Sequence, residues 1–167
     1  MFFYCFVFCF VSLLAYYADR NHYQYACFMH TDNGYPNLYI ASLIYFLLVF
    51  IAGFRYDVGV DFFSYFYSFN SDLENVILSI KIFKEPGIRI LSFVSRKLIF
   101  DNGISLIFTC SSITIFLYLF TIYKYSKSFA FCVILYMLMG EWHGSFNGIR
   151  QYIASAILFF GHNVLCK

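Results

Sequence analysis

The stretch LYIASLIYFLLVFIAGF (Leu38–Phe54), followed at once by RYDVGVD (Arg55–Asp61), decides the fold predicted for this chain. Its first part carries no charged residue and has roughly the length that a helix needs to cross a bilayer. Its second part places one cation, two carboxylates and a glycine directly after the apolar run. Charged groups at the mouth of a membrane helix bundle are costly and usually functional. The stretch therefore predicts a membrane helix that ends in a polar site.

The composition of the whole chain supports a membrane setting. Hydrophobic residues make up 62% of the 167 residues, charged residues only 12%, and the mean hydropathy is +0.71. Soluble domains carry about 25% charged residues, so this chain has too little polar surface for water. The net charge of +2, without a basic run, argues against nucleic acid. The cysteines and histidines show no metal-ligand spacing, so we expect no metal and no cofactor.

Other apolar runs predict further spans. Phe2–Ala18 has no preceding Lys or Arg and no clear small-x-small cleavage site, which favours a retained helix over a signal peptide. Asp19–Asn37 contains turn-forming residues and predicts a polar connector. The remaining expected spans are Ile104–Tyr123, Phe129–Gly140 and Ile149–Leu165. The prediction is an all-α, polytopic transmembrane bundle of about five spans, forming one membrane domain over residues 1–167.

The segment between Arg55 and Gly103 predicts two amphipathic helices on the membrane surface. Ser71 and Glu74 have capping-box spacing and would start the first of them. Pro86 suits the first position of the second. In that second helix the apolar face is expected to hold Ile88, Leu91, Val94 and Leu98, and the polar face Arg89, Ser92 and Arg96.

The basic loop predicts how the chain lies across the membrane. Lys124 and Lys127 sit tight against two spans, which favours the cytoplasmic side for this loop. Counting spans outward from it places the amino terminus outside. The same count places 55–102 and 141–151 together on the outer, non-cytoplasmic surface.

The first polar cluster allows two interpretations. Arg55 can pair with an aspartate as a structural clasp. Alternatively, Arg55 binds an anion while Asp61 or Asp57 acts as a base or positions a hydroxyl. In that interpretation Gly59 lets the backbone approach a ligand closely.

A second polar cluster opens the last expected helix. Asn147, Arg150, Gln151 and Ala154 fall on one helical face. A helix start with an arginine at its mouth suits a phosphate, because free amides, the helix dipole and the guanidinium all attract an anion. A plain interfacial anchor is the competing interpretation of Arg150. Two more carboxylates expected on this surface, either bases or helix-end residues, are Glu85 and Glu141.

Four short motifs, in order, resemble a known family. They are R-Y-D-V-G-V-D-F-F-S-Y, E-P-G, K-Y-S-K and F-N-G-I-R-Q-Y-I-A. Together they are similar to the EpsG-like, Wzy-type polysaccharide polymerases, and the similarity runs from Leu38 to about Phe160. Val60 departs from the family pattern, which tends to have threonine there.

The resemblance implies a fold, a reaction and a location. It implies a GT-C-like enzyme of the bacterial inner membrane in exopolysaccharide, capsule or O-antigen assembly. Such enzymes join undecaprenyl-pyrophosphate-linked repeat units on the outer face by metal-independent glycosyl transfer, alongside other membrane proteins of polysaccharide assembly.

The resemblance also implies roles for individual residues. Arg55 and Arg150 would grip the pyrophosphate. Asp61 or Glu85 would be the catalytic residue that activates the acceptor hydroxyl. The other substrate-binding residues implied are Asn147, Gln151, Gly59 and Tyr65.

The length of the chain leaves alternatives open. Family members commonly have more spans, so the resemblance implies an amino-terminal part of a longer protein. A non-catalytic truncated remnant is one alternative. A small transporter or lipid-binding membrane subunit is another, but a transporter would need ionisable residues in the middle of spans, and the charges here sit at span ends.

Overall fold

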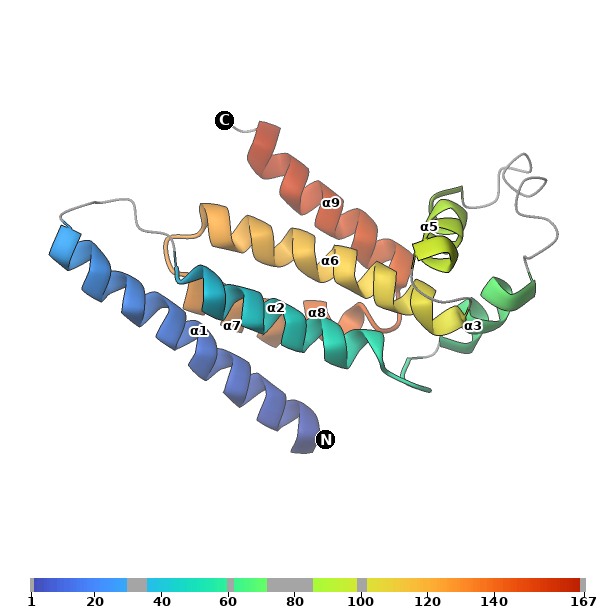
Figure 1. Cartoon of the computed structure of the whole chain (residues 1–167), viewed down its shortest axis with the longest axis horizontal. Coiled ribbons are helices and arrows are strands. Elements are labelled where there is room, and N and C mark those ends of the chain that lie inside the picture. The colour runs from blue at the N-terminus through green and yellow to red at the C-terminus, as the bar shows by residue number, and fades with distance from the viewer. Residues whose placement is uncertain (1, 30–35, 60–61, 72–85, 99–101, 166–167) are drawn as a thin grey trace.

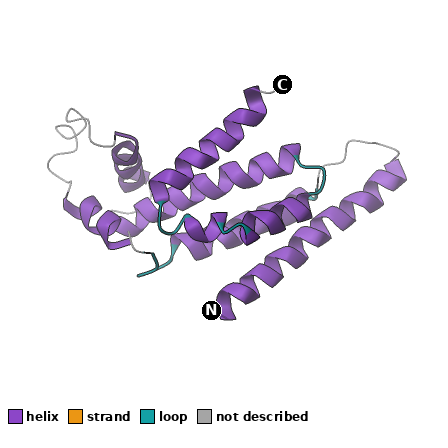
Figure 2. Ribbon diagram, turned by 180° about the vertical axis from the view of Figure 1, so that it is seen from behind, coloured by secondary structure: helices purple, strands orange, loops and turns teal. Residues whose placement is uncertain are grey.

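The structure is a computed structural model, and it describes residues 2–29, 36–59, 62–71, 86–98 and 102–165 (Figure 1). Within these ranges all regular structure is helical and no strand occurs (Figure 2). The predicted all-α class is therefore confirmed for the described part of the chain.

Five of the described helices form the bundle (Figure 1). They are α1 (Phe2–Met29), α2 (Leu38–Gly53), α6 (Gly103–Tyr125), α7 (Phe129–Leu138) and α9 (Ile149–Leu165). Helices α2 and α6 run roughly along the long axis of the molecule (Figure 1). Helix α6 is central and packs against both α2 and α9, while α7 packs against α1. The bounds of α2, α6 and α9 match the predicted apolar runs to within a few residues.

The helices bury a stripe of apolar side chains and expose another. Leu48, Ile115 and Val133 are fully buried in the main core. Phe46 is 67% exposed and Leu158 is 72% exposed on the outside of the same bundle. An apolar exterior of this kind suits contact with lipid rather than water.

Among the residues that the structure describes, two helical segments are long and apolar enough to cross a membrane, namely Phe2–Arg20 and Gly103–Tyr125. Helices α2 and α7 are apolar but shorter. The expectation of about five spans is thus supported by length and composition for two of them.

The polar connector predicted to begin at Asp19 is wrong, because α1 continues to Met29. No glycine or proline interrupts the sequence before Gly34, so nothing stops the helix at Asp19. Asp19 instead has a tertiary role: its Oδ2 accepts hydrogen bonds from Ser128 Oγ (3.0 Å) and from the backbone N–H of Ala130 (2.9 Å). The carboxylate therefore caps the start of α7 and ties it to α1.

Two further helices, α3 (Phe62–Ser71) and α5 (Pro86–Leu98), lie at one end of the bundle, where α6 and α9 begin (Figure 1). The start of α5 at Pro86 was predicted correctly, but its predicted faces hold only in part. Ile88 and Leu91 of the expected apolar face pack against the core, whereas Val94 of that face is exposed. Ser92, expected on the polar face, is buried, because a small serine allows close helix packing. The amphipathic helix predicted after Ser71 lies outside the described residues.

A tight connection joins α7 to α9. Gly140 has a φ of 78°, a left-handed conformation that suits glycine, and it reverses the chain after α7. The short helix α8 (Glu141–Gly144) follows, and the predicted break rich in small residues separates it from α9. This connection carries the second polar cluster to the end of the bundle where α3 and α5 lie.

Candidate anion-binding site

The two polar clusters meet in the structure. Gly59, in the loop after α2, has a φ of 104° and lies directly against the loop before α9. A Cβ at this position would collide with the carbonyl oxygen of Phe146 and come within 3.0 Å of Asn147 Oδ1. The predicted close approach at Gly59 is therefore made to Phe146 and Asn147. It fixes the two clusters at the same end of the bundle.

Arg55 is the most unusual residue at this end. Its side chain is only 6% exposed, and its guanidinium carbon lies 4.6 Å from the centre of the Phe146 ring. None of its three guanidinium nitrogens has a hydrogen-bond partner in the part of the chain that the structure describes. The predicted clasp between Arg55 and Asp57 is therefore not formed. Asp61, the other expected partner, is outside the described residues.

The contact with Phe146 does not by itself balance the burial of Arg55. A cation–π contact contributes about 2 kcal/mol at most when desolvated. Removing an ion from water costs several kcal/mol even after relaxation. The ring of Phe146 alone therefore does not offset the burial of this charge, and the described residues supply no other partner for it.

Burial also acts on the acid–base equilibrium of Arg55. It lowers the pKa of the guanidinium to about 10, and the nearby Tyr4 phenol acts in the opposite direction. The side chain remains protonated at neutral pH. The site is therefore a permanent positive charge held at the end of the bundle.

Four aromatic rings form a cluster that includes the Phe146 ring against this charge. Tyr4 comes from α1, and its ring centre lies 4.8 Å from that of His143 in α8. Trp142 is fully buried, with its ring centre 5.2 Å from that of Phe146. The indole Nε1–H of Trp142 also lacks a partner among the described residues. Two unsatisfied buried donors, on Arg55 and Trp142, thus flank the same phenylalanine ring. Buried donors without an acceptor are costly, which again points to an anionic or oxygen-rich ligand.

Arg150 approaches the same end from the start of α9. Its Nε donates a hydrogen bond of 2.8 Å to the hydroxyl of Tyr65, which belongs to α3 and is 8% exposed. The guanidinium carbon also lies 5.6 Å from the centre of the Tyr65 ring. Tyr65, predicted to bind substrate, therefore orients Arg150 in this structure.

Of the other residues predicted for the site, some are described by the structure and some are not. Asn147 and Gln151 are both exposed beside the loop that contacts Gly59. The two predicted catalytic carboxylates, Asp61 and Glu85, lie outside the described residues. Glu141 accepts a hydrogen bond of 3.1 Å from the hydroxyl of Tyr118, which is also 2.9 Å from Ser155 Oγ. This network joins α6, α8 and α9 and favours the helix-end interpretation of Glu141.

Sequence reasoning missed the aromatic residues around Arg55. Trp142, the single tryptophan of the chain, stands beside a polar break, which was a usable signal. Tyr4 could not have been identified from the sequence, because it lies inside a long apolar run that contains many aromatic residues.

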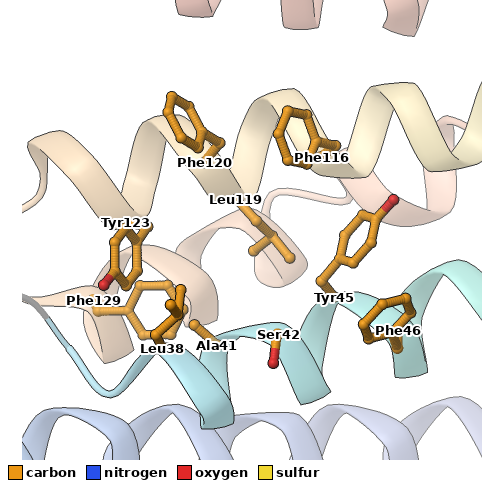
Figure 3. A pocket seen from close by; sticks show the side chains of 10 residues that line it. All are labelled: Leu38, Ala41, Ser42, Tyr45, Phe46, Phe116, Leu119, Phe120, Tyr123 and Phe129. Carbon is orange, nitrogen blue, oxygen red and sulfur yellow. The ribbon is translucent and has the colours of Figure 1, made fainter.

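A separate apolar groove lies between α2 and α6 (Figure 3). Its volume is about 290 Å³, and it lies toward the start of α2 and the end of α6, away from Arg55. Its lining contains no charged side chain, so it is not an anion site. The lining residues are Leu38, Ala41, Ser42, Tyr45, Phe46, Phe116, Leu119, Phe120, Tyr123 and Phe129.

Comparison with known proteins gives one result. The model of the EpsG family matches residues 38–167. Neither the curated proteins nor the solved structures include a match to this chain. The matched region contains Arg55, Tyr65, Phe146 and Arg150, and α1, which brings Tyr4, precedes it. The chain therefore belongs to the EpsG family.

Proposed function

We propose that this chain binds an undecaprenyl-pyrophosphate-linked oligosaccharide and takes part in joining repeat units into a polysaccharide. Membership of the EpsG family suggests a polymerase-type membrane protein of exopolysaccharide production. The proposal adds the substrate, a GT-C-like fold and a multi-pass location in the bacterial inner membrane, with the amino terminus and the Arg55 end outside. The observation that supports it is the buried guanidinium of Arg55, which has no hydrogen-bond partner in the described part of the chain.

The chemistry of a lipid pyrophosphate fits this end of the bundle. A guanidinium presents several N–H donors in a planar fork, which matches phosphate oxygens. In the proposed reaction the acceptor hydroxyl oxygen bonds to the anomeric carbon, and the bond from that carbon to the pyrophosphate breaks. The pyrophosphate departs with added negative charge. Arg55 and Arg150 stabilise that charge because they are already oriented, by Phe146 and Tyr65 respectively.

The proton of the acceptor hydroxyl needs a base. Asp61 and Glu85 are the proposed candidates, one following the Gly59 loop and the other directly preceding α5. Asn147 and Gln151 are proposed to orient the sugar or the phosphate, since both are exposed beside the same loop.

The arginines are tested in the cell that makes the polymer. Arg55→Ala or Arg150→Ala should lower polymer yield by about a hundredfold, the scale of losing one preorganised donor to a developing charge. Lipid-linked single repeat units should accumulate at the same time. Arg20→Ala, an exposed arginine of α1, is the matched control and should leave polymer unchanged. Normal polymer in both site variants would overturn the proposal.

Substitution of the two carboxylates distinguishes a catalytic function from one in which the chain only binds the lipid. Asp61→Asn and Glu85→Gln should leave binding of the lipid pyrophosphate intact while one of them abolishes polymer. If neither substitution changes polymer yield, the chain binds the lipid without supplying the base. In that case a lipid-binding membrane subunit is the correct description.

A further inference from the structure

A second cavity adjoins Arg150. It has a volume of about 420 Å³ and lies between α5 and the first turns of α9. This size falls within the roughly 300–1,000 Å³ of typical ligand pockets. The lining side chains that matter here are Ile88, Leu91, Arg150, Ile153, Ala154 and Ile157.

The cavity has a polar end and an apolar body. On α9, Arg150, Ala154 and Ile157 recur at helical spacing and form one stripe. Arg150 lies in the first turn, and Ile157 lies about 10 Å further along the axis. Arg150 is the charged residue of the described lining, and the rest of the stripe is apolar.

The two ends select an amphiphilic anion. Arg150 and the start of α9 both favour negative charge at one end. The apolar stripe favours a hydrocarbon chain that runs along α9 away from that charge. Ala154 is exposed and Ile157 is 53% exposed, so such a chain can continue out of the cavity along the helix. The groove between α2 and α6 has no charged lining residue to hold a headgroup.

We propose that the cavity between α5 and α9 receives the first part of the isoprenoid chain of the lipid-linked substrate, with the pyrophosphate at the Arg150 end. The inference rests on the proposed function, because it assigns the lipid part of the same substrate. It gives α5 a specific role as one wall of a chain-binding groove.

The test compares two ligands in bilayers. The purified chain is placed in phosphatidylcholine nanodiscs and titrated with inorganic pyrophosphate or with farnesyl pyrophosphate. Ala154→Trp fills the groove, and Leu158→Trp is the control on the same helix, at a side chain that is 72% exposed and outside the cavity lining. Comparing variant with wild type for each ligand cancels the partition of the lipid into the bilayer.

The inference predicts a selective loss. Ala154→Trp should weaken farnesyl pyrophosphate by about tenfold or more, the scale on which apolar pockets discriminate a methylene. It should leave inorganic pyrophosphate unchanged, and Leu158→Trp should leave both unchanged. Unaltered binding of farnesyl pyrophosphate by Ala154→Trp would overturn the inference but not the proposed function. Absence of pyrophosphate binding by the wild-type chain would overturn the proposed function itself.

Photolabelling gives a readout that does not depend on the tryptophan variant folding. A farnesyl pyrophosphate analogue with a diazirine on its chain should label peptides from α5 and α9. Labelling confined to the groove between α2 and α6 would contradict the inference.

Discussion

At Arg55 a positive charge is buried against Phe146, and the sequence predicted only half of that arrangement. The charge was visible because it follows an apolar run. Its neighbours were not, because helix packing brings Tyr4 to the charge and Trp142 to the Phe146 ring. Periodicity within one segment carries no information about such contacts.

The unpaired state of Arg55 predicts opposite effects on stability and binding. Arg55→Met keeps an unbranched side chain of similar volume and removes a buried charge that has no hydrogen-bond partner among the described residues. The variant should be more stable by about 1–4 kcal/mol, as when buried ions are replaced by apolar residues of similar volume. Thermal unfolding followed by circular dichroism in detergent measures this. Binding of pyrophosphate should be lost, and a destabilised Arg55→Met would show that the charge is satisfied in the ligand-free protein.

His143 predicts how stability depends on pH. Burial lowers the pKa of this imidazole, so the folded protein favours its neutral form. In the unfolded chain the pKa is about 6.5. The stabilising contribution is therefore fully present above that pH and is lost as the pH falls through the lower, folded value.

The measurement is the unfolding midpoint between pH 8 and pH 4.5. The wild-type midpoint should fall with acidification, and His143→Gln should reduce the fall. His162→Gln, on the exposed face of α9, is the matched control. An identical pH profile for the wild type and His143→Gln would contradict the prediction.

At the scale of elements, the bounds of the apolar helices α2, α6 and α9 were predicted well. The end of α1 and the faces of α5 were predicted less well. Helices α2, α6 and α9 are bounded by charges, glycines or turn residues, which mark their ends in the sequence. Helix α1 continues beyond its predicted end. Asp19, expected to begin a polar connector, instead accepts hydrogen bonds from Ser128 and Ala130 at the start of α7, which is far away in the sequence. The faces of α5 were only partly predicted, because Ser92 packs inward and Val94 outward while Ile88 and Leu91 face the core as expected.

The loop after α2 depends on one glycine. Gly59→Ala should destabilise the protein by about 1–3 kcal/mol, because it combines a left-handed backbone with a collision against Phe146. It should also separate the two polar clusters and weaken pyrophosphate binding. Gly161→Ala is the control, since that glycine has open space around it and lies inside α9. Denaturation midpoints that drop equally for both variants would contradict the assigned role of Gly59.

At the scale of the whole molecule, composition and family motifs established the all-α class and the EpsG family. Counting spans from the basic loop predicted that both polar clusters lie on the same side, and the contact at Gly59 shows that they share one end of the bundle. The number of spans was less predictable, because an apolar run shorter than a bilayer resembles a buried core helix.

The side of the membrane occupied by this end remains a prediction that labelling tests. In a variant whose cysteines are replaced by serine, Tyr56→Cys and Lys127→Cys report on opposite ends of the bundle through exposed positions. A membrane-impermeant maleimide should label Tyr56→Cys in intact cells and Lys127→Cys only after lysis. The reverse pattern would place the candidate site on the cytoplasmic side and contradict the proposed reaction.

The central claim, that the Arg55 end is a lipid-pyrophosphate site, is tested most directly by equilibrium binding of farnesyl pyrophosphate to the chain in nanodiscs. The account predicts saturable binding that Arg55→Ala weakens by about 10- to 100-fold, the scale of hydrogen bonds from a charged donor. Farnesol, which lacks the pyrophosphate, should bind without regard to Arg55. Equal affinity of the wild type and Arg55→Ala for farnesyl pyrophosphate would contradict the account.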